Sequence, residues 1–464
     1  MEVIFTLFLC ALSSAGGQSI YPPPAHPRDP SKLGVGIQRT MTLLATSTPA
    51  KRNKVKILFY GQSITEQSWW KAVADDLRKR FPYADIEIEN KAIGGFASQL
   101  LIRPAEHDVY PFYPDLVIFH VYGSNKEYEE IIRNIRSRTT AEVLMQKDHV
   151  TQWPPAVPDE KTDKAAWWDH MMNNVFLPEI AAKYGCALLD IRSDWLDYLK
   201  SNNLEPKALL SDDVHLNDWG NYLMAELVKR YLVYRPDIAR SNSWQDTVKT
   251  YNVAGASAGE SGETLKWKNG RLVLAFEGNR VDVISAYTGR GEPGTARVLI
   301  DGKKPSEFPT LYSITRPTPG PWSPLALTRV DYVSPLKAEE WTLTITSVSE
   351  GSSRWEFEVV GSVTGPDGRG SSDAVFVSKS GRVKIEPASF FRNGEIPKGY
   401  QIRWKVVPMH VDVYKPPRVE DPSREYVTTL AQGLPNTKHV LELVASDGKA
   451  VPVKAIRVYR PPVR

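Results

Sequence analysis

Apolar runs and amphipathic segments alternate along the chain from Val55 to Tyr234. The apolar runs predict strands, and the segments between them, with an apolar position every three or four residues, predict helices. This alternation indicates a parallel sheet covered by helices. The predicted strands lie near 55–60, 86–90, 115–121, 142–146 and 186–191, and the predicted helices near 68–80, 126–138, 165–184 and 217–232.

The pattern changes after Arg235-Pro236, where short alternating or apolar runs are separated by Gly, Pro and Asp turns. It predicts an all-β region, for which a jelly-roll-like sandwich is one arrangement. Residues near 310–415 then form either long insertions or a second sheet. We therefore divide the chain into an α/β domain over 54–236 and a C-terminal β-sandwich region over 245–464.

The N-terminus carries a short apolar run, followed by Ser13 and Ala15 at the −3 and −1 positions of a cleavage site. This pattern predicts a signal peptide over 1–15, and the run is too short to span a bilayer. We expect a secreted or periplasmic protein with no membrane span after cleavage. The Pro-rich segment 16–53 is predicted as a lead-in, with order beginning near residue 34 or 54.

Composition excludes several classes of function. A chain of 464 residues is long enough for two or more domains. Its 58 Lys and Arg nearly balance 54 Asp and Glu, and no basic stripe of the kind that binds nucleic acid is present. No HExxH motif or Cys/His cluster calls for a metal. Cleavage after Ala15 removes Cys10 and leaves Cys186 alone, so no internal disulfide is expected.

The sequence Gly61-Gln62-Ser63 places a serine between a predicted strand and a predicted helix. A serine at such a turn is exposed, and its own N–H faces the position of a developing oxyanion. A serine nucleophile needs a base, and the base needs a carboxylate to orient it. Asp212 and His215, three residues apart before a predicted helix, supply both groups.

Two further groups follow neighbouring strands. Gly95 comes after the second predicted strand and can offer an unobstructed N–H, and Asn125 comes after the third and offers a side-chain amide. Ligands bind at the carboxyl edge of an open α/β sheet, where all of these residues are expected. Taken alone, Gly61-Gln62-Ser63 is also explained as an ordinary turn, and Asp212 with His215 as the start of a helix.

These four blocks, in this order, resemble the SGNH hydrolases, also called GDSL esterases. The residues that name the family correspond to Ser63, Gly95, Asn125 and His215, with Asp212 as the acid. The resemblance covers roughly residues 54–234. It implies a three-layer α/β/α sandwich of flavodoxin-like order and ester hydrolysis through an acyl-enzyme without a cofactor.

The chain departs from the family pattern at two positions. Gln62 replaces the usual Asp before the serine, and Lys126 stands where an acidic residue often follows the Asn. Gly-Gln-Ser turns recur in family branches that deacetylate carbohydrates. The departures therefore bear on the substrate more than on the mechanism.

Several residues are candidates for substrate binding: Gln62, Trp69, Tyr122 and His149. The chain has 13 Trp. Neighbouring residues on a helix point in different directions, so the two rings of Trp69-Trp70, or of Trp167-Trp168, cannot both face the protein core. His120 and His149 either line the pocket or are structural. The GxGxxG match at 289–294 lies between β-like segments and predicts a hairpin loop rather than a dinucleotide site.

The expected function is an exported SGNH-type esterase that removes acetyl groups from a polysaccharide or oligosaccharide. Two alternatives remain open. One is a lipid or aryl esterase of the same family, and the other is a glycan-binding protein without activity. The β-region either binds carbohydrate or braces the α/β domain and shapes its rim, and the sequence does not determine the oligomeric state.

Overall fold

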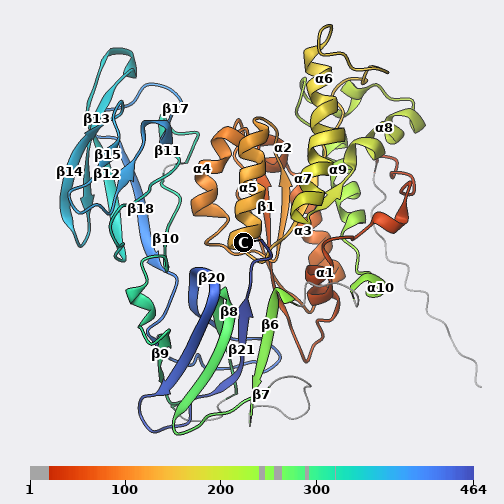
Figure 1. Ribbon diagram of the computed structural model, residues 1–464. Coiled ribbons are helices and arrows are strands. Elements are labelled where there is room, and N and C mark those ends of the chain that lie inside the picture. Colours follow the sequence, from red (N-terminus) through yellow and green to blue (C-terminus); the bar gives the residue numbers. More distant parts are fainter. Residues whose placement is uncertain (1–19, 240–245, 255–263, 288–291, 319, 464) are drawn as a thin grey trace, which may run out of the picture.

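The computed structural model describes residues 20–239, 246–254, 264–287, 292–318 and 320–463, and sets an α/β unit beside an all-β region (Figure 1). The signal peptide predicted over 1–15 lies outside these residues, as does the first half of the glycine motif at 289–291. No helix in the described ranges is long and apolar enough to cross a membrane.

A five-stranded parallel sheet forms the centre of the α/β unit, in the order β2-β1-β3-β4-β5. This order is that of flavodoxin-like folds. All five predicted strands are confirmed, with small changes at their ends. They are β1 (Lys54–Gly61), β2 (Asp85–Asn90), β3 (Leu116–His120), β4 (Glu142–Gln146) and β5 (Ala187–Leu189).

Helices cover both faces of this sheet, as the predicted three-layer sandwich requires. Alternate residues of β1 serve opposite faces: Ile57 and Phe59 pack with α1, α3, α8 and α9, while Leu58 and Tyr60 pack with α4, α5 and α7. The helices are α1 (Gln38–Ala45), α2 (Ser63–Glu66), α3 (Trp69–Arg80), α4 (Ser98–Asp108), α5 (Asn125–Arg138), α6 (Lys164–Met171), α7 (Leu177–Tyr184), α8 (Ile191–Ser201), α9 (Asp218–Tyr231) and α10 (Pro236–Ala239).

The helices are predicted less completely than the strands. A π-helical turn at Met172–Phe176 divides the helix expected over 165–184 into α6 and α7. Helices α1, α4 and α8 were not predicted, nor were the one-turn helices α2 and α10. Helix α1 falls within the segment 16–53, and the buried Glu142 carboxylate accepts hydrogen bonds of 2.8 Å from the N–H groups of Arg39 and Thr40 in its first turn.

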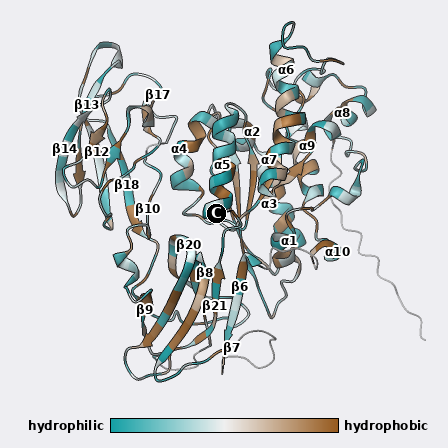
Figure 2. Cartoon of the chain, in the orientation of Figure 1, coloured by the Kyte–Doolittle hydropathy of each residue, from teal (hydrophilic) through white to brown (hydrophobic). Residues whose placement is uncertain are grey.

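The β-region contains two larger sheets with separate cores. The strands on either side of residues 310–408 form a seven-stranded sheet whose apolar residues recur along β8, β20 and β21 (Figure 2). Its strands are β6 (Val248–Val253), β7 (Thr264–Leu265), β8 (Arg271–Ser285), β9 (Ala296–Ile300), β19 (Val413–Tyr414), β20 (Val427–Ala445) and β21 (Val453–Tyr459).

The inserted residues form the second sheet, which has five strands, and two short strand pairs beside it. The five strands are β10 (Tyr312–Ile314), β12 (Glu339–Val348), β13 (Trp355–Gly361), β14 (Gly365–Ser371) and β18 (Gln401–Pro408). The pairs are β11 (Leu325–Leu327) with β17 (Phe390–Arg392), and β15 (Phe376–Val377) with β16 (Lys384–Ile385).

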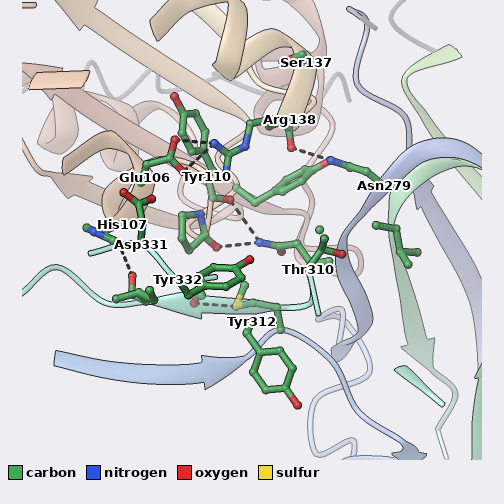
Figure 3. A pocket seen from close by; sticks show the side chains of 18 of the residues that line it. Glu106, His107, Tyr110, Ser137, Arg138, Asn279, Thr310, Tyr312, Asp331 and Tyr332 are labelled. Atoms are coloured by element: carbon green, nitrogen blue, oxygen red, sulfur yellow. Dashed lines mark hydrogen bonds and ion pairs between the residues drawn. The ribbon is translucent and has the colours of Figure 1, made fainter. Parts of the chain in front are cut away.

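The seven-stranded sheet meets the α/β unit at the ends of α4 and α5, away from the carboxyl ends of the parallel strands. Asn279 joins the two units there, because its amide donates to the Arg138 carbonyl and accepts from the Tyr113 hydroxyl at 2.8 Å. A cavity of about 410 Å³ lies at this junction (Figure 3). Its lining includes Glu106 and Tyr332 but none of the candidate site residues.

A second junction joins α4 to the inserted sheet. Both nitrogens of the buried His107 ring contact backbone groups of the inserted region: Nδ1 lies 2.9 Å from the Ile314 carbonyl, and Nε2 accepts from the Val330 N–H at 3.2 Å. Because Nε2 accepts, Nδ1 is the protonated nitrogen of a neutral ring. Burial lowers the pKa of His107 to about 4.

This junction should make stability pH-dependent. Protonation of His107 replaces the acceptor that faces the Val330 N–H with a second donor. Since the folded pKa lies below the ordinary value of 6.5, the unfolded chain binds the proton first, and stability falls as pH drops from about 6.5 to 4. The loss approaches about 3 kcal/mol if His107 alone is considered.

Thermal unfolding between pH 7 and 4.5 measures this effect. His107→Gln should unfold at a lower temperature than wild type at pH 7 and lose less stability on acidification. His26→Gln, at an exposed position, serves as the control and should follow wild type. An acid slope for His107→Gln equal to that of wild type would contradict the assignment.

Candidate active site

The turn between β1 and α2 presents Ser63 at the carboxyl edge of the sheet. Strand β1 ends at Gly61, Gln62 is extended, and Ser63 is the first residue of α2. A β-carbon on Gly61 would lie 2.0 Å from the His120 carbonyl oxygen of the adjacent β3. Only glycine therefore allows the two strands to end side by side and the chain to turn into the serine.

Ser63 forms a hydrogen-bonded chain with two residues that follow it by about 150 positions. Its Oγ lies 2.9 Å from His215 Nε2, and His215 Nδ1 lies 2.8 Å from Asp212 Oδ2. The carboxylate fixes the tautomer in which Nδ1 carries the proton and Nε2 accepts from the serine hydroxyl. The arrangement has the connectivity of a nucleophile, a general base and an orienting acid.

Asp212 is held in its ionised form by the backbone of its own loop. The N–H groups of His215 and Val214 each donate to Asp212 Oδ1 at 2.7 Å. These two bonds and the bond from the His215 ring lower the pKa of Asp212 to about 2. The carboxylate is exposed and is charged above about pH 3.

Gln67 fastens the loop that carries His215 to the turn that carries Ser63. Its amide donates to the Leu216 carbonyl at 2.8 Å and accepts from the Leu216 N–H at 3.0 Å. This pair of bonds spans 149 positions of sequence and sets the distance between base and nucleophile. Sequence reasoning missed Gln67, since a single Gln after a short helix gives no signal of its partner.

Gly95 and Asn125 lie at the same edge as Ser63. Gly95 follows β2, is exposed and has a φ of 72°, which favours glycine. A β-carbon on its neighbour Gly94 would lie 3.4 Å from the Ser63 β-carbon, so this loop adjoins the serine. Asn125 is exposed as the first residue of α5, directly after β3 and its loop.

Trp69, one of the predicted substrate-binding residues, has its ring buried in the core rather than open at the surface. Its ring is 1% exposed, packs edge-on to Phe59 and donates through Nε1 to the Ile64 carbonyl at 2.6 Å. Trp70 also packs against Phe59, at 5.9 Å between ring centroids, but it is partly exposed and is therefore the ring of the pair that reaches solvent. Trp167 and Trp168 are both partly exposed.

His149 was also predicted to bind substrate, but it is a buried structural residue. Its Nε2 lies 2.8 Å from the Val214 carbonyl, so it supports the loop of His215 from beneath. Burial lowers its pKa to about 4. His120 is buried as well, with Nε2 2.6 Å from Asp148 Oδ1, which agrees with the structural alternative for both histidines.

The other two substrate-binding candidates differ in exposure. Gln62 is 3% exposed and its side chain does not cap α2, so it is a buried residue of the turn. Tyr122 is exposed at the end of β3, with its ring edge-on to Trp168. In the described part of the chain, no group of three or more His, Cys, Asp or Glu is placed to hold a metal ion.

Comparisons with known proteins give low similarity. No family model matches the chain, and no curated protein matches it. Among solved structures, Axe2, an acetylxylan esterase from Geobacillus stearothermophilus, is 19% identical with a TM-score of 0.34, over 40% of this chain and 98% of that one.

Two further structures give similar values. A two-domain esterase (CEX) active on acetylated mannans is 16% identical with a TM-score of 0.36, over 93% of this chain and 97% of its own. LAE5, an α/β hydrolase enzyme from the metagenome of Lake Arreo, Spain, is 18% identical with a TM-score of 0.33, over 38% and 94%. These values are too low to transfer a function to this chain.

The close packing of the turn before Ser63 predicts that a methyl group added at Gly61 lowers the stability of the fold strongly. Gly61→Ala should lower the unfolding temperature markedly or prevent folding, because its β-carbon would overlap the His120 carbonyl. We expect a loss above about 3 kcal/mol from such overpacking. Gly320→Ala is the matched control, since a β-carbon there meets nothing within 4 Å, and it should unfold like wild type. Equal stability of the two variants would contradict the proposed constraint.

Proposed function

We propose that the chain is a serine esterase of the SGNH type that removes acetyl groups from a polysaccharide or oligosaccharide. The observation that carries the proposal is the hydrogen-bonded chain from Ser63 through His215 to Asp212 at the carboxyl edge of the sheet. Export to a secreted or periplasmic location belongs to the same proposal and rests on the N-terminal sequence pattern.

The reaction follows from these three groups. Ser63 Oγ attacks the ester carbonyl while His215 Nε2 takes its proton. The imidazolium that forms is stabilised by Asp212, which stays ionised because of its three hydrogen bonds. His215 then gives the proton to the leaving sugar hydroxyl, and a water molecule activated by the same base cleaves the acyl-enzyme to release acetate. No step requires a cofactor.

The developing oxyanion needs donors on the side of the carbonyl away from His215. We assign this role to the N–H groups of Ser63 and Gly95 and to the amide of Asn125. Each follows a different strand of the sheet, and the Gly94–Gly95 loop adjoins Ser63. Removing one such donor typically lowers kcat by about 10²–10³-fold.

Substrate chain length separates this proposal from a lipid or aryl esterase. A lipid esterase hydrolyses p-nitrophenyl esters faster as the acyl chain lengthens from acetate to octanoate. A deacetylase should show a steep fall after acetate. A glycan-binding protein without activity would keep its affinity for polysaccharide but hydrolyse none of these esters.

The nucleophile is tested by removing its hydroxyl. Ser63→Ala should lower acetate release from acetylated polysaccharides by at least about 10³-fold without changing the fold. Ser68→Ala is the control, because Ser68 is exposed and its side chain does not cap α3. It should retain wild-type activity. Hydrolysis that persists in Ser63→Ala would show that another residue is the nucleophile.

The role of Asp212 as the orienting acid can be tested against the neighbouring Asp213 as a control. Asp212→Asn should lower kcat by about 10²–10⁴-fold, because the amide no longer fixes the tautomer or stabilises the imidazolium. The loss should persist from pH 5 to 9, since Asp212 is ionised over that whole range. Asp213→Asn removes an exposed carboxylate that lies 3.8 Å from the Lys207 ammonium, and it should behave as wild type. Equal kcat values for the two variants would exclude the role of Asp212.

A further inference from the structure

The loop between β10 and β11 in the inserted region carries an exposed tryptophan to the edge of the candidate active site. Trp322 is 61% exposed, although its ring lies beside the Gly94–Gly95 loop. A β-carbon on Gly94 would lie 2.9 Å from Trp322 Cζ2, and one on Gly95 would lie 3.6 Å from Cη2. The six-membered edge of the indole therefore rests on the loop to which we assign an oxyanion donor.

A carboxylate and the nucleophile meet at the same point. The Gly94 β-carbon position is 2.6 Å from Glu66 Oε2 and 3.4 Å from the Ser63 β-carbon. Glu66 is the last residue of the short helix that Ser63 begins, and it is exposed. Glycine at position 94 thus allows an aromatic ring, a carboxylate and the serine to gather around one small space.

The segment that carries Trp322 is fixed to the α/β unit rather than hanging over it. Before the tryptophan, Arg316 donates to both carboxylate oxygens of the buried Asp108 and, at 2.9 Å, to the Lys91 carbonyl. After it, β11 pairs with β17, whose Phe391 packs edge-on to Phe96. These two attachments define the position of the tryptophan relative to Ser63.

Packing against the α/β unit does not account for the Trp322 ring, because most of the ring is not buried. Aromatic side chains that brace the junction are covered, as Phe96 is, whereas most of the Trp322 surface is open to solvent. An exposed indole face gives an apolar platform, and a nearby carboxylate accepts hydrogen bonds from hydroxyl groups. A sugar ring has both complementary features, an apolar face of C–H groups and a rim of hydroxyls.

We propose that Trp322 and Glu66 form a sugar subsite beside Ser63. In this subsite a sugar ring of the acetylated carbohydrate stacks on Trp322, and one of its hydroxyl groups donates a hydrogen bond to the Glu66 carboxylate. The inference rests on the proposed esterase function and extends it, because it makes the inserted β-sheet part of the substrate site. Carbohydrate esters are then favoured over simple alkyl esters by contacts from both units of the chain.

The test compares two acetyl esters, a chemically acetylated xylo- or manno-oligosaccharide and ethyl acetate. Trp322→Ala should lower the ratio of kcat/KM for the oligosaccharide to kcat/KM for ethyl acetate by at least about 10-fold, and Trp322→Phe should restore part of it. Glu66→Ala should lower the same ratio by about 5-fold or more. Tyr287→Ala is the control, because Tyr287 is 66% exposed in the β-region and follows β8 of the other sheet. It should leave the ratio unchanged.

Binding to the inactive protein separates this proposal from the esterase function. Calorimetry with the acetylated oligosaccharide should show at least about 10-fold weaker binding to Ser63→Ala/Trp322→Ala than to Ser63→Ala alone. If wild type hydrolyses no ester but this difference in binding appears, the function fails and the subsite stands. If Trp322→Ala leaves both the ratio and the binding unchanged, or lowers the activity on both esters equally, the subsite is wrong.

Discussion

The hydrogen bond between Ser63 Oγ and His215 Nε2 is the contact on which the rest of the site depends. It joins two loops separated by 152 positions, and neither loop could hold it alone. The Gly61 turn aims the serine, while Gln67 and His149 hold the backbone on either side of His215. These three residues are explained by the need to keep that distance.

The β-region is attached to the α/β unit at two places with different consequences. The seven-stranded sheet lies at the far ends of α4 and α5, where Asn279 connects the units and no candidate site residue is near. The inserted region is held by His107 and by the Arg316–Asp108 pair, and its loop between β10 and β11 reaches the edge where Ser63 lies. The first attachment braces the α/β unit, and the second brings the Trp322 side chain to the candidate site.

Much of the fold could be predicted from the sequence because its signals are local. The inner parallel strands are mostly apolar runs, the edge strand β2 alternates apolar and charged residues, and β1 ends at a glycine that the turn requires. The order of the blocks around Ser63, Gly95, Asn125 and His215 placed all four at one edge. Helices α1 and α4 gave weaker patterns, since α1 contains buried Gln38 and Arg39, and α4 contains Pro104.

The remaining features depend on contacts between distant residues, which a single sequence does not reveal. An aromatic residue near a site either lines it or packs into the core, and only the orientation of α3 shows that the Trp69 ring is buried. Trp322 lies 259 positions after Ser63, in a Pro-rich segment of a different unit, and nothing in its surroundings indicates where that segment is attached. Gln67 and His149 act on the backbone of another loop and carry no motif.

The most direct measurement is covalent labelling of the nucleophile. A fluorophosphonate reacts with an activated serine by forming a bond from Oγ to phosphorus as fluoride leaves, and mass spectrometry of the digested protein locates the adduct. An adduct on Ser63 is expected, and it should be lost in His215→Ala, because the hydroxyl is activated only by that base. An adduct on another residue, or ester hydrolysis by a protein in which Ser63 is never labelled, would show that the site lies elsewhere.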